Sequence, residues 1–279
     1  MRAVAPWLTL ALTLAAAAPA LAVESSDVVR REFAFAGGGR TVSIDNVFGP
    51  VTVRAGVGDR VEVVIRRTWR ADDAAALERA AREVTLEVRE SPERLELEQD
   101  GPFRCEDCRR HRWDDPGYEV EWAWEVTVPA GAALEAATVN GGDLVVEGVR
   151  GAVSVANVNG AVRLSGLGGR ASASTVNGDL EAEFDAVLAA PARFSTVNGE
   201  IELAFPRGLG AELAFETLNG EVYTDFAFEA SALPAAVERE GGRAGTRYRL
   251  GRDTVVRLGG GGPRLACSTV NGDIVIRER

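Results

Sequence analysis

The residues with the clearest potential for chemistry lie in a short polar segment, Phe103–Pro116, which reads FRCEDCRRHRWDDP. Two residues separate Cys105 from Cys108, and His111 follows. In an exported chain such a pair predicts a local disulfide. The alternative is a thiophilic metal such as Zn²⁺ held by the two thiols and His111, with a following aspartate completing the usual four ligands. We predict the Cys105–Cys108 disulfide, with no metal or cofactor.

A second set of candidates is a column of acidic residues that follow recurring Asn-Gly pairs, namely Asp179, Glu200, Glu221 and Asp273. If these carboxylates stack about 5–10 Å apart, they repel one another by up to ~1 kcal/mol in water. That cost is compatible with a solvated face, which is our interpretation. The alternative is a Ca²⁺-binding column, since oxygen ligands at this spacing suit the ion. The dense Gly/Asp nonapeptide pattern of calcium-binding β-rolls is missing.

Aromatic side chains share one face of a strongly alternating segment, at Tyr118, Trp122 and Trp124. Such a row can stack on sugars, but glutamates occupy the opposite face of the segment. We therefore predict that the aromatic row packs in the core.

Catalysis has little support in the sequence. The chain has one histidine, His111, so a Ser-His-Asp triad has no framework. No phosphate-binding glycine loop precedes a helix, and no pair of carboxylates stands out. We predict a protein that is not an enzyme. The alternative is a polysaccharide-processing enzyme that uses carboxylates in a groove.

The N-terminal residues 1–22 have the features of a secretory signal peptide. Arg2 is followed by an apolar run and by the small-x-small site Ala20-Leu21-Ala22. No later stretch is long and apolar enough to span a bilayer. We expect a mature chain from about Val23 that is exported to the periplasm or the cell surface and has no membrane span.

The charge balance narrows the class of partner. The chain has 42 acidic and 31 basic residues, a formal net charge of −11. Such a field repels nucleic acid and anionic lipid surfaces. We therefore expect no nucleic-acid partner, and instead an envelope protein or a carbohydrate.

The elements that position these residues come from an internal repeat, S/T-V-N-G followed by an acidic and then an apolar residue. The Asn-Gly pairs are Asn140-Gly141, Asn159-Gly160, Asn177-Gly178, Asn198-Gly199, Asn219-Gly220 and Asn271-Gly272. Gly49 marks a degenerate early copy with Phe48 in the asparagine place. Apolar residues alternate with polar ones on both sides of each pair, which predicts two strands per repeat and an all-β protein.

Two folds fit this pattern. In an antiparallel meander of Asn-Gly hairpins, the aliphatic residue before each asparagine lies on the polar side. A parallel β-solenoid (β-helix) uses the pair as a corner between stacked coils, and we favour it. It predicts that Val176 and its equivalents turn into the core, that glycine supplies backbone freedom, and that the asparagines hydrogen-bond in a ladder.

The remaining segments complete the predicted domain organisation. Residues 23–130 read as N-terminal strands and a small α/β cap containing the Cys loop 103–116, and residues 131–279 as solenoid repeats. Residues 228–262 interrupt these repeats, as a protruding loop or a degenerate coil. Strands are expected at Thr41–Asp45, Val51–Arg54, Val61–Arg66, Val84–Arg89, Arg94–Glu98 and Tyr118–Val128, the last capping the open end, and a helix at Asp72–Glu83. Cys267 falls in the apolar column of Phe194 and Phe215, which predicts a buried, unpaired thiol.

The segments TVNGDL, VNGAV, TVNGEI, TVNGDI, VTVPAGAALEAATVNG and GGGGPRLACSTVNGDI resemble a bacterial family of unknown function that is named "putative adhesin" and has β-strand repeats; head-GIN autotransporter-adhesin domains look similar. The resemblance covers roughly Thr41–Arg279. It implies a right-handed β-helix that is exported to the cell envelope and serves as an adhesin-like binding or structural module. It supplies no catalytic residues, and Phe103–Pro116 departs from its pattern. An envelope-stress sensing module is a further alternative.

Overall fold

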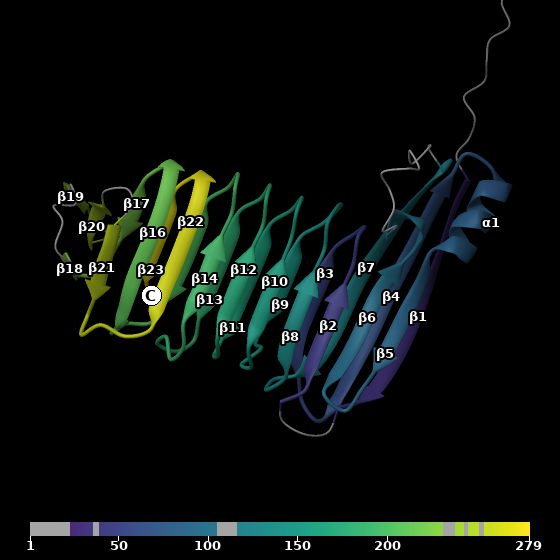
Figure 1. Ribbon diagram of the computed structural model, residues 1–279, viewed down its shortest axis with the longest axis horizontal. Helices are drawn as coiled ribbons and strands as arrows, with labels where there is room; N and C mark the ends of the chain where they lie inside the picture. The colour runs from purple at the N-terminus through teal and green to yellow at the C-terminus, as the bar shows by residue number, and fades with distance from the viewer. Residues whose placement is uncertain (1–22, 36–38, 105–115, 231–237, 243–244, 251–253) are drawn as a thin grey trace, which may run out of the picture.

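The computed structural model describes residues 23–35, 39–104, 116–230, 238–242, 245–250 and 254–279. The chain is all-β and forms two large mixed sheets that lie face to face along an elongated body (Figure 1). Neither sheet is closed. Sheet A has twelve strands in the order β1-β4-β7-β3-β9-β11-β13-β15-β23-β17-β20-β19, and sheet B has eleven in the order β18-β21-β16-β22-β14-β12-β10-β8-β2-β6-β5. No helix among the described residues is long and apolar enough to cross a membrane.

The N-terminal elements follow the sequence expectations closely. They are β1 (Val23–Ala34), β2 (Thr41–Asp45), β3 (Val51–Gly56), β4 (Arg60–Ala71), α1 (Ala74–Glu83), β5 (Thr85–Glu90), β6 (Arg94–Asp100), the 3-10 turn Pro102–Arg104 and β7 (Tyr118–Pro129). Asp73 caps α1, because its side chain accepts a hydrogen bond from the Ala76 amide at 2.7 Å. Strand β1 was not predicted; its residues are mostly exposed, so its sequence lacks a buried alternating face.

The repeats supply one strand to each sheet in turn. Sheet B receives β8 (Ala133–Ala137), β10 (Val153–Ala156), β12 (Ala171–Ser174), β14 (Ala192–Ser195), β16 (Ala211–Asn219) and β22 (Arg264–Asn271). Sheet A receives β9 (Leu144–Glu147), β11 (Val162–Leu167), β13 (Leu180–Phe184), β15 (Ile201–Phe205), β17 (Val222–Thr224) and β23 (Ile274–Glu278). Equivalent strands pair in parallel, with Val155 between Ala136 and Ala173. The strands flanking each corner lie in different sheets, so the hairpin meander is wrong.

The order of the repeats in space differs from their order in the chain. Strand β22 lies between β14 and β16, and β23 lies between β15 and β17 (Figure 1). The last repeat in the sequence therefore does not stand at the end of the stack. Four short strands lie beyond β16 and β17 at this end of the stack, namely β18 (Phe228–Ala230), β19 (Glu238–Gly242), β20 (Gly245–Leu250) and β21 (Thr254–Leu258). Strand β21 pairs antiparallel with β16 and β18, and β20 pairs antiparallel with β17 and β19. The described parts of residues 228–262 thus add short antiparallel strands to both sheets.

The predicted cap at the other end also needs correction. Strand β7 lies inside sheet A, between β4 and β3, and its register with β3 is parallel. The sheets end instead at β1 and β5. The long alternating pattern of β7 reflects burial of one face over its whole length, with Trp122 and Trp124 at 0% and 1% exposure. The core placement of these aromatic residues is confirmed.

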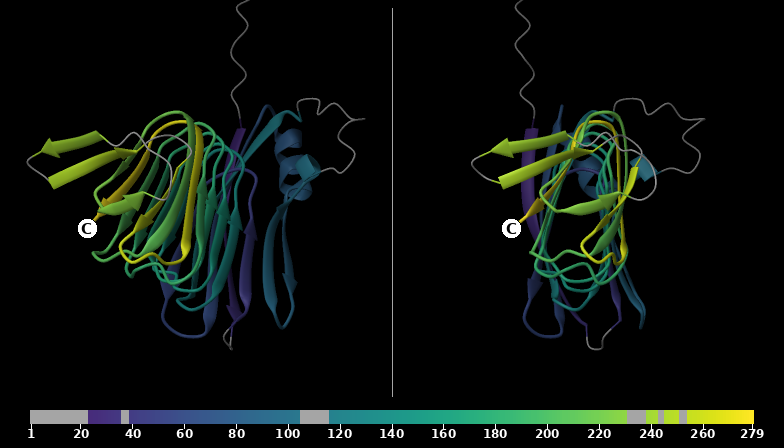
Figure 2. Two further views of the ribbon diagram at one scale, coloured as in Figure 1. Left: turned by 60° about the vertical axis from the view of Figure 1, so that its left-hand side comes forward. Right: turned by 90° about the vertical axis from the view of Figure 1, so that its left-hand side faces the viewer.

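The core lies between the two sheets and is made of the inward positions of every repeat (Figure 2). Phe184 stacks on Phe205 with ring centroids 4.5 Å apart and meets Phe194 edge-on at 6.1 Å. Cys267 pairs in register with Phe194 on β14 and Phe215 on β16 and is a buried free thiol, as predicted. Its apolar surroundings raise its pKa.

Candidate binding surface

Each corner begins with a buried polar side chain that the sequence analysis missed. Thr175 Oγ1 donates a hydrogen bond to the carbonyl of Gly160 in the neighbouring repeat at 2.9 Å, and Thr196 does the same to Gly178 at 3.0 Å. Asn157 takes this place in its repeat and donates to the Gly142 carbonyl at 3.0 Å. The other members of this clamp column are Asn46, Thr138, Thr217 and Thr269. Six members of the clamp column tie a corner to its neighbour, while Asn46 donates to the Gly49 carbonyl within its own corner.

At Gly178 and Gly199 close stacking requires glycine, whereas Gly141 has a left-handed φ of +85° and its ideal Cβ has no contact closer than 3.5 Å. An ideal Cβ on Gly199 lies 2.0 Å from the Gly178 carbonyl oxygen, and one on Gly178 lies 2.2 Å from that of Gly160. The φ angles of these two residues lie outside the left-handed region. The predicted reason for glycine, backbone freedom, is therefore incomplete, because the neighbouring repeat leaves no room for a side chain.

The asparagines form the ladder that the repeat predicts. The side-chain amide of each donates to the side-chain oxygen of the next at 2.7–2.8 Å, in the order Asn219 to Asn271 to Asn198 to Asn177 to Asn159 to Asn140. All the amide groups therefore point the same way along the stack. Most of these side chains are exposed, so the ladder lies on the surface.

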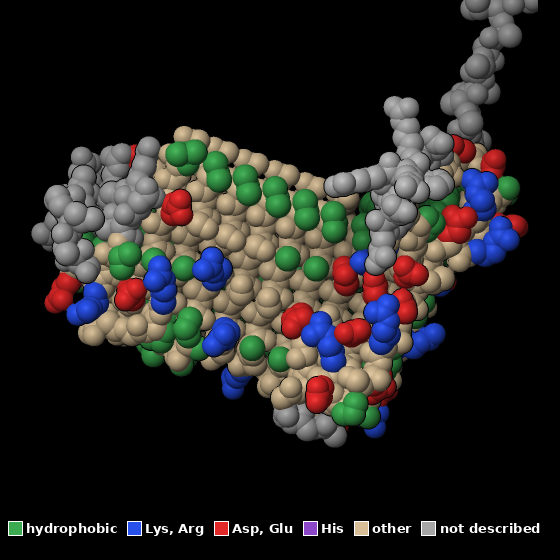
Figure 3. All heavy atoms as spheres, viewed as in Figure 1, with side chains coloured by type: hydrophobic (Ala, Val, Ile, Leu, Met, Phe, Trp, Pro, Cys, Tyr) green, Lys and Arg blue, Asp and Glu red, His purple; other side chains and the backbone are tan. Residues whose placement is uncertain are grey.

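The aliphatic residue before each asparagine points outward, not into the core. Val176, Val197 and Val270 are 38–40% exposed and Leu218 is 62% exposed. The predicted inward turn is wrong because strand alternation continues as far as the aliphatic residue and breaks only at the asparagine: the buried clamp residue takes the inward position and the aliphatic residue takes the outward one. Figure 3 shows a row of hydrophobic side chains along the upper border of the molecule, above the strands of sheet B.

We call this double row the corner strip; its members are exposed except Val139, Asn140 and Val158, which are half-buried. It consists of Val139, Val158, Val176, Val197, Val270 and Leu218 with Asn140, Asn159, Asn177, Asn198, Asn271 and Asn219. Neighbouring members lie one strand spacing apart, ~4.8 Å. The strip offers a straight apolar edge beside a row of amides, at right angles to the strands.

Next to the corner strip, two strands of sheet B carry small, uncharged side chains on their outer face. On β10 and β12 the outward residues are Ser154, Ala156, Ser172 and Ser174. The outer face of sheet A is charged by contrast, with Arg163 on β11, Glu181 and Glu183 on β13, and Glu202 on β15. Arg163 pairs there with Asp143 and lies 3.7 Å from Glu181. The uncharged area is local, because other outward residues of sheet B are charged, including Glu135 on β8, Arg193 on β14 and Glu212 on β16.

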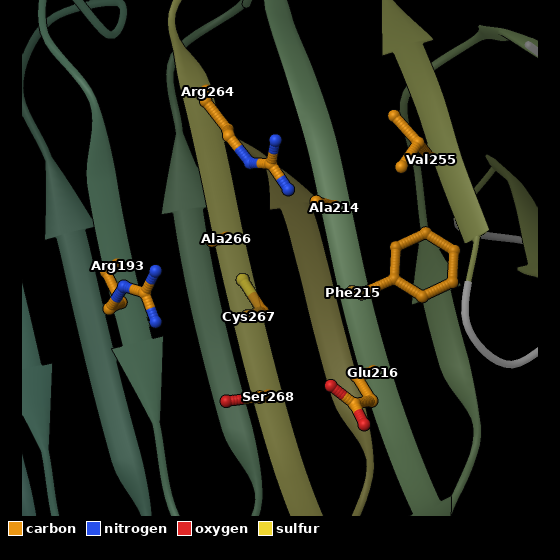
Figure 4. A pocket seen from close by; sticks show the side chains of 9 residues that line it. All are labelled: Arg193, Ala214, Phe215, Glu216, Val255, Arg264, Ala266, Cys267 and Ser268. Atoms are coloured by element: carbon orange, nitrogen blue, oxygen red, sulfur yellow. The ribbon is translucent and has the colours of Figure 1, made fainter.

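A shallow depression of about 480 Å³ lies on the same outer face of sheet B, across β14, β22, β16 and β21. Its lining includes Arg193, Arg264 and Glu216 over a floor of small residues, Ala214, Ala266 and Ser268 (Figure 4). Arg264 also lies 3.7 Å from Glu212. This end of the face thus carries charged side chains, unlike the stretch over β10 and β12, whose outward residues are serine and alanine.

Three corner aspartates, two of them from the acidic column, accept backbone hydrogen bonds from the neighbouring repeat. Asp143 accepts the amide N–H of Ala161 at 3.0 Å, Asp179 accepts that of Glu200 at 2.9 Å, and Asp273 accepts that of Glu221 at 2.8 Å. Partial burial pushes the pKa of Asp143 upward, but hydrogen bonds from Arg163 and the Ala161 amide outweigh it and lower the pKa.

Glu200 shows the opposite balance. Partial burial and then the charges of Asp273, Glu202 and Asp179 raise its pKa, against the opposing charge of Arg277. Among the described residues, no group of three or more His, Cys, Asp or Glu is placed to hold a metal ion. The signal peptide, the Cys105–Cys108 pair and His111 lie outside the described residues, so those predictions stay as they were.

Comparison with known proteins finds only solved structures of low sequence identity. No family model matches the chain, and no curated protein matches it. A Clostridium sporogenes structure described as a "putative cell adhesion protein" has 10% identity and a TM-score of 0.49, over 91% of this chain and 100% of that one. A Bacteroides fragilis "putative adhesin" has 10% identity and a TM-score of 0.33, over 91% and 97%. A Parabacteroides distasonis "putative lipid binding protein" has 9% identity and a TM-score of 0.36, over 91% and 97%.

Proposed function

We propose that the protein is an exported, non-catalytic, adhesin-like binding module of the cell envelope, and that its corner strip contacts the partner. The repeats would wind as a right-handed β-solenoid that holds the corner strip straight. The signal-peptide pattern at residues 1–22 supports export, to the periplasm or the cell surface. The observation that carries the proposal is the corner strip itself, with four aliphatic side chains 38–62% exposed in one row.

Physical chemistry favours a protein partner for such a surface. Scattered exposed aliphatic residues are ordinary, but a contiguous row marks an interaction site. Fully burying one more valine side chain of this exposure adds about 1 kcal/mol. The amide row beside it offers donors and acceptors to a polypeptide backbone. The outward residues of β10 and β12 beside the strip carry no charge, so no like charge there opposes the approach of an acidic partner.

The test compares envelope binding of the mature protein with that of a strip variant, Val176→Thr, Val197→Thr and Val270→Thr combined. Threonine keeps the shape and the strand preference of valine but reduces the apolar contact by about 0.5 kcal/mol per position, so we expect roughly tenfold weaker binding. The control variant is Glu181→Gln with Glu202→Gln on sheet A, which should bind like the parent. Equal binding by all three proteins would contradict the proposal.

The same assay separates the two classes of partner. Envelope fractions are treated either with protease or with periodate, which destroys vicinal diols of sugars, before the labelled protein is added. Loss of binding after protease treatment alone supports the protein partner. Loss after periodate treatment alone would point to a carbohydrate instead.

A further inference from the structure

The repeat that comes last in the sequence fills a slot inside the stack. Strands β22 and β23 occupy it, with β14 and β15 on one side and β16 and β17 on the other. The chain passes the slot once, from β15 to β16, and returns to it after the intervening residues 225–263. Until that return, the strands on both sides of the slot have one unpaired edge each.

The inserted segment makes backbone hydrogen bonds to the strands on both sides of the slot. The Thr196 and Ile201 amides donate to the carbonyls of Ser268 and Asp273 at 3.0 and 2.9 Å, and the Ile274 amide donates to that of Glu221 at 2.9 Å. Four side chains of the inserted segment are at most 2% exposed, namely Leu265, Cys267, Ile274 and Ile276. The slot thus binds its occupant through backbone pairing and an apolar core together.

Charge complementarity adds to this fit. The three arginines of the inserted segment each meet acidic residues of earlier repeats: Arg264 lies 3.7 Å from Glu212, Arg277 lies 3.2 Å from Glu202, and Arg279 lies 2.8 Å from Asp185. The Arg279 guanidinium also donates to the Phe184 carbonyl at 2.6 Å. These pairs are partly exposed and individually weak, but they favour this basic segment over an acidic one.

Four glycines, Gly259–Gly262, connect β21 to the inserted segment Arg264–Arg279, and we call them the glycine hinge. Gly259 and Gly261 have φ angles of +54° and +80°, and a Cβ on Gly260 would meet nothing within 4 Å. The hinge crosses the start of β16 closely, since a Cβ on Gly262 would lie 2.2 Å from the Gly210 carbonyl oxygen. Four successive glycines give this connection many accessible conformations, so moving the segment away costs little backbone strain.

We propose that the slot is an interaction site for the same segment, Arg264–Arg279, of a second copy of this chain. Every contact in the slot is made by residues of that segment, so a second copy supplies it with identical backbone pairing, apolar contacts and ion pairs. Reciprocal exchange through the glycine hinges then produces a closed dimer. This inference is independent of the corner strip and its partner.

The experiment uses the full chain in a Cys267→Ala background. One population carries Ser195→Cys and the other Ser268→Cys; they are mixed, unfolded and refolded together at high concentration under mild oxidation. Ser195 and Ser268 are in register on adjacent strands, within reach of a disulfide. The matched control replaces Ser195→Cys by Ser174→Cys, one strand further from Ser268 at ~9.6 Å and therefore out of reach.

We expect the 195–268 disulfide dimer, identified by peptide mapping, at ten or more times the amount of the 174–268 dimer. A single chain with both Ser195→Cys and Ser268→Cys, refolded when dilute, should close its disulfide internally and remain a monomer, which verifies the geometry. If that internal disulfide forms but the two mixtures give equal cross-linking, or none, the exchange proposal is overturned.

Discussion

At the scale of single residues, the repeat motif assigns a different task to each position. The threonine clamps, the aliphatic residue faces outward, the asparagine joins the ladder and the glycine admits the neighbouring repeat. Sequence alternation alone predicts the strands, and the Asn-Gly spacing predicts the ladder. It does not reveal the glycine contact, because that depends on how closely the Gly178 carbonyl approaches Gly199.

Gly199→Ala should destabilise the fold by about 2 kcal/mol or more, since its Cβ would lie 2.0 Å from a backbone oxygen that cannot move alone. Urea denaturation measures this as a lower midpoint. Gly260→Ala is the matched control, because a Cβ there meets open space. Equal midpoints for the two variants would refute the steric role of the corner glycine.

Glu200 gives a pH-dependent prediction. Its pKa is raised in the folded state by partial burial and by Asp273, Glu202 and Asp179. Protonation therefore favours the fold, so the favourable contribution is present at low pH and is lost as pH rises through the folded pKa. Glu200→Gln should raise the melting temperature slightly at pH 7 relative to the parent, with the difference vanishing near pH 4. High salt should shrink the part of the effect that comes from the charges of Asp273, Glu202 and Asp179, because the Glu200 side chain remains accessible to solvent. If Glu200→Gln raised the melting temperature more at pH 4 than at pH 7, this prediction would be wrong.

At the scale of elements, the corner depends on the clamp column. The alternation Ala171, Ala173, Thr175 was visible in the sequence and places the threonine inward. The prediction of an inward valine instead assumed a change of parity at the corner. The structure shows that the change comes later, at the Asn-Gly pair, where the chain passes from sheet B to sheet A.

Thr196→Val should therefore cost about 1 kcal/mol, because it removes the hydrogen bond to the Gly178 carbonyl at 3.0 Å while keeping the side-chain volume. Thermal unfolding measures the loss. Ser195→Ala, on the outward side of the same strand, is the control and should change stability little. A neutral Thr196→Val would show that the clamp does not stabilise the corner.

At the scale of the whole molecule, sequence periodicity predicts the number of repeats but not their order. Nearly identical motifs at Asn219 and Asn271 carry no information on which of them neighbours Asn198. Ion pairs favour the observed order of the repeats, because Arg277 pairs with Glu202 and Arg279 pairs with Asp185 when the last repeat occupies the slot. Pairing partners that lie 70 residues or more apart in the chain are not visible in a local pattern.

Removing Arg264–Arg279 should disturb the molecule unevenly. The amides of Thr196 and Ile201 lose their partners, and β16 and β17 lose their parallel neighbours. Hydrogen exchange should therefore speed up in residues 192–224, while β9, β11 and β2 keep their protection. Uniform loss of protection over the chain would instead indicate that the two sheets fold as one cooperative unit. Unchanged protection in residues 192–224 would show that the inserted repeat is not needed there.

The slot stays empty until the last repeat has been synthesised, and this delay has a consequence for folding during biosynthesis. Ribosomes add about 5–20 residues per second, and 39 residues separate Thr224 from Arg264. For roughly 2–8 seconds after β17 is synthesised, the edges of β14 and β15 and those of β16 and β17 that face the slot have no strand between them. Chaperone demand should thus peak during that interval, and slowing translation by rare codons within residues 225–263 should lower the soluble yield more than the same codons placed before residue 190.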